Sequence, residues 1–171
     1  IIEQIDALAS IATEFSNFAR LPSGTLENID LQEVVKTAIQ LFGDETKVRF
    51  KHHLQDSAII IRADKEQCLR VLNNIIKNAI QACVDREEAI IEISYVIDGK
   101  SVELQIKDNG CGIALEEQAR IFEPNFTTKT TGSGLGLSMV KNIMQGFGGS
   151  IRFESELQKG TSFFLHFPLQ S

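Results

Sequence analysis

Two apolar-rich runs, at 89–97 and 100–107, flank the short sequence Asp98-Gly99-Lys100. Asp-Gly between two such runs is a strong signal for a tight β-hairpin, which joins antiparallel strands. This feature constrains the fold most, because it requires a sheet that is at least partly antiparallel. The neighbouring segments must then be read as further strands of that sheet or as helices that cover it.

Helical periodicity and end signals predict four helices, and the remaining apolar runs predict short strands. Asp30 and Asp64 are expected to cap the first two helices, with Gln67 completing a capping-box pattern after Asp64. The helices are expected at 30–43, 64–84 and 135–146, with a short one at 115–121, and the strands at 47–54, 57–63, 150–157 and 161–169. This order predicts an α+β fold, a two-layer sandwich with helices on one face of a mixed, mostly antiparallel sheet.

Residues 1–21 form a separate amphipathic pattern before that sandwich. Apolar residues recur at steps of four and three, as in a coiled-coil seam, and the sequence "LPSG" at 21–24 ends the helix. Two interpretations remain open from the pattern alone: the helix packs against partner helices, or it packs on the core of its own domain. Because the chain starts within a helix and without Met, we expect a piece of a longer protein.

Charge and cysteine content exclude several classes of function. The net charge of −6 disfavours nucleic acid or anionic lipid as a partner, so an anionic ligand needs local cations, backbone amides or a metal. No apolar run approaches the roughly 20 residues that span a bilayer, so no membrane contact is expected. Cys68, Cys83 and Cys111 lack metal-ligand spacing, which predicts small buried thiols in a reducing cytoplasm.

The helix at 64–84 carries an unusual row of amides opposite its apolar side. Asn74, Asn78 and Gln81 lie on one face, although asparagine is a poor helix former. One interpretation is a solvated face shared with Arg70 and Lys77. The other is that an amide oxygen is one ligand of a Mg²⁺ ion whose other ligands are phosphates and water.

A second polar feature is the sequence "DNGCGI" at 108–113. It is either an ordinary surface turn or a site in which the Asp108 carboxylate accepts a hydrogen bond from an exocyclic amine. Glycines at 132, 134 and 136 lead into the helix at 135–146, a pattern that suits phosphate binding by backbone amides. The pattern is neither a Walker loop nor a dinucleotide fingerprint. The segment 123–132, with the cation Lys129, is either a plain loop or a lid over such phosphates.

Taken together, the motifs resemble the nucleotide-binding boxes of the sensor histidine kinases. The matching sequences are "N-x-x-x-N-A" from Asn74, "D-x-G-x-G" at 108–112, "F-E-P-x-F-T-T-K" at 122–129, "G-x-G-L-G-L-S" at 132–138 and "G-T" at 160–161. The resemblance implies the Bergerat, or GHKL, fold for residues 25–171 and an ATP-binding catalytic domain. Residues 1–24 resemble the end of the dimerisation and histidine-phosphotransfer helix with its linker, most closely that of the nitrogen-regulation kinases.

The resemblance also implies roles for individual residues. Asp108 would accept from the N6 amine of adenine, supported by Thr161 through water, and Asn78 would be the Mg²⁺ ligand. Asn74 and Lys129 would contact the phosphates and would be the residues nearest the phosphoryl group that is transferred. The remaining expected nucleotide contacts are Gly110, Gly112, Ile113, Gly132, Ser133, Gly134, Leu135, Gly136, Leu137 and Thr161. ATP and Mg²⁺ are the implied cofactors.

Two departures from the family pattern bear on the activity. Gln81 stands where many members have a phosphate-binding lysine, and no histidine followed by an acidic residue precedes Asn74. His52, His53 and His166 are therefore expected to be structural, and the acceptor histidine is expected in a bundle domain absent from this chain. The implied partners are that bundle domain, a second protomer and the receiver domain of a response regulator. A cytoplasmic location is implied, with anchoring of a longer parent in the inner membrane left open.

Two alternatives to phosphotransfer remain. The fold also occurs in ATPases, but the topoisomerase and mismatch-repair enzymes carry a glutamate at the position of Asn74, and an amide cannot act as that base. A nucleotide-sensing scaffold that never transfers phosphate is the other alternative, and the presence of every ATP-contacting box weighs against it.

Overall fold

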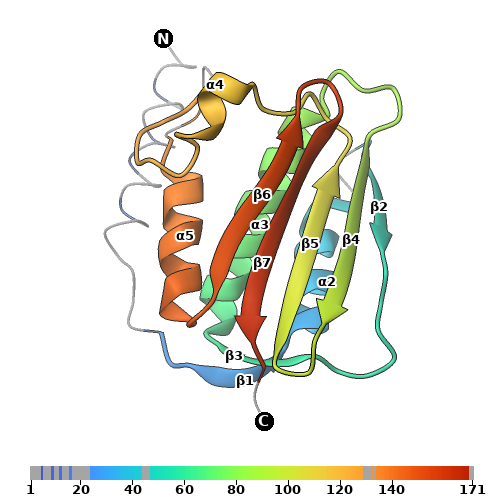
Figure 1. Ribbon diagram of the computed structural model, residues 1–171, viewed down its shortest axis with the longest axis vertical. Coiled ribbons are helices and arrows are strands. Elements are labelled where there is room, and N and C mark those ends of the chain that lie inside the picture. The colour runs from blue at the N-terminus through green and yellow to red at the C-terminus, as the bar shows by residue number, and fades with distance from the viewer. Residues whose placement is uncertain are drawn as a thin grey trace.

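A five-stranded sheet forms one layer of the fold, with the strand order β2-β4-β5-β7-β6 (Figure 1). The strands are β2 (Arg49–His52), β4 (Ile90–Ile97), β5 (Ser101–Asp108), β6 (Ser150–Glu156) and β7 (Gly160–Pro168). The β4–β5, β5–β7 and β6–β7 pairs are antiparallel, whereas β2 runs parallel to β4. The sheet is therefore mixed and mostly antiparallel, as predicted. This computed structural model describes residues 24–43, 47–128, 132 and 134–169, together with Ile5, Ala9, Ala12 and Ser16.

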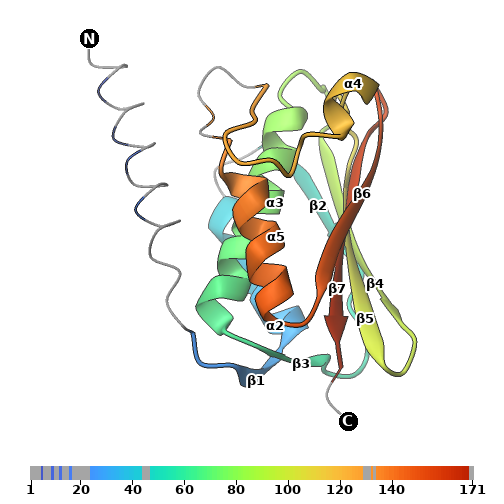
Figure 2. The same cartoon turned by 60° about the vertical axis from the view of Figure 1, so that its left-hand side comes forward.

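Three helices cover one face of the sheet (Figure 2). They are α2 (Leu31–Gly43), α3 (Lys65–Ala82) and α5 (Gly136–Gly146), and a short helix α4 (Leu115–Gln118) lies near the end where β5 finishes. The Asp64 carboxylate accepts a hydrogen bond from the Gln67 N–H at 2.8 Å, and Asp30 accepts from the Gln32 N–H at 3.0 Å. Both predicted helix caps are confirmed. The helix predicted at 115–121 ends earlier, at Gln118.

A second, two-stranded sheet lies at the opposite end of the molecule from α4 (Figure 1). It pairs β1 (Glu27–Asp30) with β3 (Ile60–Ala63) in antiparallel fashion, and Ile61 makes an isolated bridge to Leu169. Strand β1 is not predicted by the local sequence pattern. The reason is physical, since a four-residue segment of mixed polarity becomes a strand through pairing with a partner about 30 residues away.

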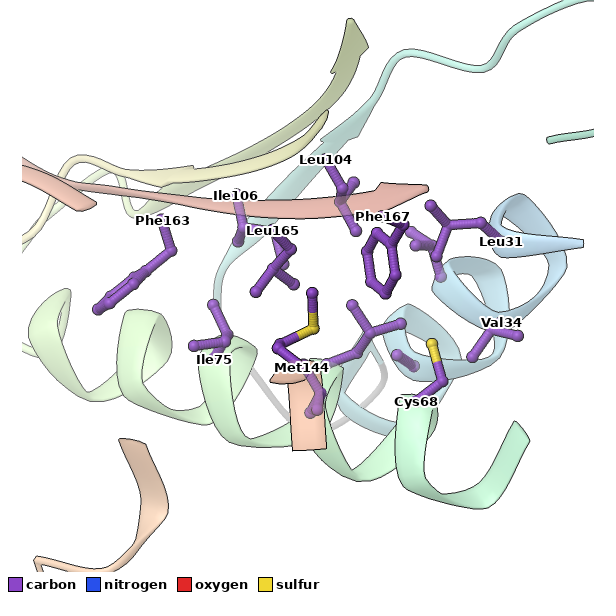
Figure 3. Packing of buried hydrophobic residues seen from close by; sticks show 14 of the residues in the cluster. Leu31, Val34, Cys68, Ile75, Leu104, Ile106, Met144, Phe163, Leu165 and Phe167 are labelled. Atoms are coloured by element: carbon purple, nitrogen blue, oxygen red, sulfur yellow. The ribbon is translucent and has the colours of Figure 1, made fainter. Parts of the chain in front are cut away.

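The core lies between the sheet and the three helices (Figure 3). Side chains from β5 and β7 meet side chains from the helices there, and they include Leu104, Ile106, Leu165, Phe167, Ile75 and Met144. The apolar arc predicted for α3 is confirmed, because Leu72, Ile75, Ile76, Ala79 and Cys83 are all buried. The opposite, polar side of α3 is not part of this core, so a binding site can form there.

The predicted helix over residues 1–21 lies outside the described residues, except for Ile5, Ala9, Ala12 and Ser16, which are helical. The proposed boundary at residue 24 therefore stays a prediction. Among the described parts of the chain, no helix is both long enough and apolar enough to cross a membrane.

Candidate functional site

Helix α3 presents three residues four positions apart, Asn74, Asn78 and Ala82, which therefore share one face. A helix rises about 1.5 Å per residue, so this row is about 12 Å long. A glycine closely approaches each end. A Cβ built on Gly136 would lie 2.5 Å from the Asn74 Oδ1, and one built on Gly110 would lie 2.6 Å from the Ala82 carbonyl oxygen. Two separate segments thus converge on opposite ends of the same helical face.

The two asparagines are joined to each other. The Asn78 Nδ2 donates to the Asn74 Oδ1 at 3.4 Å. An amide coordinates Mg²⁺ through its oxygen, which Asn78 does not use in this bond, so the donor set fits a site completed by phosphates and water. Within the described residues, no group of three or more His, Cys, Asp or Glu could hold a metal by itself. The residues present therefore fit the predicted arrangement, in which Asn78 and the phosphates of a bound nucleotide hold the Mg²⁺ ion together.

Asp108 is the last residue of β5 and is only 3% exposed. Its Oδ1 accepts the backbone N–H of Gly110 at 2.8 Å and that of Thr161 at 3.2 Å. Both donors are complementary to an ionised carboxylate. Thr161 thus contacts Asp108 directly through its main-chain N–H, while its hydroxyl shares a hydrogen bond of 2.8 Å with the Ser155 Oγ. The predicted support through water stays a prediction.

The loop after Asp108 is held on two sides. The Cys111 N–H donates to the Ala82 carbonyl at 2.9 Å, the Cys111 carbonyl accepts from the Gln158 N–H at 2.6 Å, and the Ile113 N–H donates to the Ser155 Oγ at 2.8 Å. Gly112 has a φ of +71°, and a Cβ there would collide with the Glu156 carbonyl. Only glycine allows this close passage between α3 and the β6–β7 turn.

The cysteines divide into two kinds. Cys68 and Cys83 are buried as predicted, but Cys111 is exposed, so the expectation of three buried thiols is wrong. Cys111 lies on the loop after β5, between Gly110 and Gly112. Burial, with the charge of Asp108 as a second cause, raises the pKa of the Cys83 thiol to about 11.

A cavity of about 370 Å³ adjoins the Asn74 end of the row. It lies between α2, α3 and α5, and its lining includes Asn73, Asn74, Arg70, Lys77, Leu135 and Gly136. One interpretation of the sequence placed Arg70 and Lys77 on a solvated face of α3. Arg70 lies four residues before Asn74 and Lys77 three residues after it, so both lie on the same side of α3 as Asn74. This spacing is the feature of the sequence that could have placed them at the site. Two cations and one carboxylate, that of Glu66, therefore line the cavity next to the start of α5.

The segment before α5 folds back on itself. Gly134 has a φ of +70°, and a Cβ there would lie 2.5 Å from the Asn125 carbonyl carbon. Arg120 pairs with Glu123 at 3.1 Å, and its guanidinium carbon lies 4.5 Å from the centre of the Phe126 ring. Lys129 and Ser133 lie outside the described residues, so their predicted contacts stay predictions, as does the predicted lid.

Two of the histidines, His52 and His53, have side-chain partners. His52 shares a hydrogen bond of 2.6 Å with the Tyr95 hydroxyl, and His53 pairs with Glu92 at 2.7 Å. The two side chains thus engage different partners, as expected for adjacent residues on opposite faces of a strand. Gln81 is exposed on α3.

Comparison with known proteins gives a consistent set of sequence matches. Residues 63–171 match the family described as "Histidine kinase-, DNA gyrase B-, and HSP90-like ATPase". The chain is 33% identical over 172 residues to the signal transduction histidine-protein kinase AtoS of Escherichia coli (strain K12). It is 32% identical over 157 residues to the nitrogen regulation protein NtrY of Azorhizobium caulinodans. These alignments cover 99% and 88% of this chain but only 28% and 20% of the two relatives, so the chain spans less than a third of their length.

Solved structures share the fold. The catalytic domain of histidine kinase ThkA superimposes with a TM-score of 0.75 at 29% identity, over 84% of this chain and 95% of that one. Full-length ShkA, in complex with AMPPNP, gives a TM-score of 0.81 at 27% identity, over 99% of this chain and 37% of that one. The sandwich predicted from the order of hairpins and helices is therefore confirmed.

Proposed function

The chain belongs to the family of histidine kinase-, DNA gyrase B- and HSP90-like ATPases, and from this premise we propose that it is the ATP-binding catalytic unit of a sensor histidine kinase. Mg-ATP would lie along the amide-bearing face of α3, with its base at Asp108 and its phosphates at Asn74. The γ-phosphoryl group would pass to a histidine of a bundle domain, and from there to the receiver domain of a response regulator.

The observation that carries this proposal is the convergence of two segments on one helical face. The Gly110 loop reaches the Ala82 end and the start of α5 reaches the Asn74 end. The buried Asp108 carboxylate, already fixed by two N–H donors, is suited to accept a hydrogen bond from the exocyclic amine of adenine. Gly112 and Ile113 would form the adjoining wall of the base pocket.

At the other end, the proposed phosphate contacts come from side chains and backbone amides. Asn78 would hold the Mg²⁺ ion, which supplies charge neutralisation when bound. Asn74 and Lys129 would contact the phosphates, and the first amides of α5 would add their dipoles. The proposed backbone contacts are Gly132, Ser133, Gly134, Leu135, Gly136 and Leu137. The role of this chain is then to position and neutralise, with no covalent intermediate.

The proposal favours transfer over hydrolysis. The side chain that a Cβ on Gly136 would meet first is that of Asn74, and an amide has no basic group with which to activate water. The nucleophile is thus expected from outside, from the bundle domain of the same protein or of a second protomer. The name of AtoS, a signal transduction histidine-protein kinase, supports the same assignment.

Calorimetry with Mg-ATP tests the nucleotide site. We expect binding that requires Mg²⁺ and that weakens roughly 10- to 100-fold in Asp108→Asn, which removes a charged acceptor from a buried hydrogen bond. Asp56→Asn is the control, because Asp56 is exposed and lies on the loop between β2 and β3. Absence of ATP binding by the parent protein, or equal binding by Asp108→Asn, would refute the assignment of the base pocket.

Mixing the chain with ATP and a separately produced bundle protein that carries an acceptor histidine tests the activity. Formation of phosphohistidine is expected. If the two proteins associate and no phosphohistidine forms, the scaffold alternative is favoured. Sustained release of phosphate by the chain alone would instead favour an ATPase and contradict the role assigned to Asn74.

A further inference from the structure

Arg86 joins the loop at Gly110 to the turn at Gln158, which lies 72 residues after Arg86 in the sequence. It lies in the turn after α3, where its backbone N–H donates to the Cys83 carbonyl at 2.9 Å. Its Nη2 donates to the Gly110 carbonyl at 2.9 Å and to the Gln158 carbonyl at 2.5 Å. One guanidinium nitrogen carries two hydrogens, so it can serve both acceptors at once. The side chain therefore ties the loop after Asp108 to the β6–β7 turn.

The two segments tied by Arg86 also supply the two backbone donors that hold Asp108. The Gly110 N–H comes from the loop, and the Thr161 N–H comes from the first residues of β7, three positions after Gln158. Both donate to the same atom, Asp108 Oδ1. The relative position of the loop and the turn thus sets the direction in which the carboxylate points.

The turn at 157–159 contains an energetically unfavourable backbone conformation. Gln158 has a φ of +66°, a left-handed conformation that costs a non-glycine residue about 1 kcal/mol. The bonds from Arg86 to its carbonyl and from its N–H to Cys111 hold it there. A charged donor forms the stronger of such hydrogen bonds, so Arg86 is the side chain most able to fix the turn.

We propose that Arg86 is a positioning residue for the purine amine: by holding the Gly110 loop against the β6–β7 turn, it aims the Asp108 carboxylate at position 6 of the base. This inference rests on the proposed function, because it assumes that Asp108 reads adenine. It assigns to Arg86 no contact with the nucleotide and no part in phosphoryl transfer.

Other bonds keep the fold together when Arg86 is changed. The Asn109 side chain donates to the Glu88 carbonyl at 2.8 Å and accepts from the Ile90 N–H at 2.9 Å. The Cys111 N–H still binds the Ala82 carbonyl. Arg86→Ala is therefore expected to fold with nearly unchanged thermal unfolding while the carboxylate loses its fixed direction.

The experiment compares binding of Mg-ATP and of Mg-inosine triphosphate, which carries a carbonyl in place of the amine at position 6. Parent protein, Arg86→Ala, Arg86→Lys and the control Arg62→Ala, an exposed change on β3, are titrated by calorimetry. We expect Arg86→Ala to bind ATP roughly 3- to 10-fold more weakly, the size of losing part of a charged hydrogen bond. Its affinity for inosine triphosphate should change less, so the ratio of the two affinities falls. Lysine, with three donors, should restore most of the ratio.

Two results would overturn the inference while leaving the nucleotide site intact. One is parent protein that prefers ATP together with Arg86→Ala that keeps the same preference. The other is an equal loss of both nucleotides in Arg86→Ala with a lowered unfolding temperature and no rescue by lysine, which would show a purely structural role. Failure of the parent protein to bind ATP would instead refute the proposed function, and the inference with it.

Discussion

Replacing Gly136 by alanine separates the stability of this protein from its proposed activity. Gly136 is the first residue of α5, and a Cβ there would lie 2.5 Å from the Asn74 Oδ1 and 2.8 Å from the Nδ2. To reach the 3.4 Å of ordinary contact, the amide must move by about 0.9 Å. The obstacle is the end of a flexible side chain, so Asn74 rather than the backbone is expected to give way.

The effects on stability nearly cancel. Alanine favours the helix by up to about 1 kcal/mol over glycine, and an off-rotamer asparagine costs about 0.5–1.5 kcal/mol. The free energy of unfolding should therefore change by less than about 1 kcal/mol. Displacement of Asn74 breaks its bond to Asn78 and its proposed phosphate contact, and a hydrogen bond to a charged group contributes about 1.5–3 kcal/mol. Mg-ATP binding should weaken roughly 10- to 100-fold.

The matched control lies at the other end of the same helix. A Cβ on Gly146 would meet nothing within 4 Å, so Gly146→Ala should be stable and should bind Mg-ATP like the parent protein. Thermal unfolding and calorimetry on the three proteins give both quantities. If Gly136→Ala folds and binds Mg-ATP as tightly as Gly146→Ala, the phosphates do not lie at this end of α3.

Three further outcomes follow from individual side chains. Burial, followed by the charges of Lys36 and His53, lowers the pKa of His52 below 6.5, so the unfolded chain binds the proton more readily than the folded chain. The free energy of unfolding should therefore be highest above about pH 6.5 and should fall as the pH is lowered through the folded-state pKa. Urea unfolding at about pH 7.5 and about pH 5.5 measures this difference, which should be smaller in His52→Gln. At about pH 8, a thiol reagent should label Cys111 alone in the native protein and all three cysteines in denaturant, as mass spectrometry would count; rapid labelling of the native buried thiols would contradict the packing. Arg152 pairs with Glu103, and its guanidinium carbon lies 3.6 Å from the centre of the Phe164 ring on the exposed face of the sheet. Arg152→Ala should therefore lower the free energy of unfolding by about 1 kcal/mol or less and leave Mg-ATP binding unchanged. A weakened affinity for Mg-ATP would show that this face of the sheet contributes to the site.

The parts of the fold that the sequence predicts are those encoded by neighbours in the chain. The Asp64 cap, the apolar arc of α3 and the hairpin at Asp98 each depend on residues within a few positions of one another, and all are confirmed. By contrast, β1 and the parallel pairing of β2 with β4 depend on partners far along the chain. A local pattern carries no information on such pairing.

The same distinction applies to the candidate site: local motifs predict some of its residues, whereas contacts between distant segments cannot be predicted from them. The motifs led to Asn74 because asparagine is a poor helix former, and to Asp108 because its glycine-rich surroundings match one of the nucleotide-binding boxes. Arg86 gave no signal, because a single arginine among acidic residues is typical of a solvated loop and its two acceptors are main-chain carbonyls. The direct hydrogen bond from the Thr161 backbone to Asp108 cannot be predicted from the sequence either, since any residue other than proline would offer the same N–H.

The position of β7 has a consequence for how the protein is made. This strand follows β6 in the chain, yet it lies between β5 and β6 in the sheet. While the chain emerges from the ribosome, β5 therefore has an unpaired edge until the last described strand has been synthesised. The Thr161 N–H that fixes Asp108 arrives with that strand. A nascent chain should thus acquire ATP binding and a closed sheet in the same late step, and a chain stopped before residue 160 should have neither.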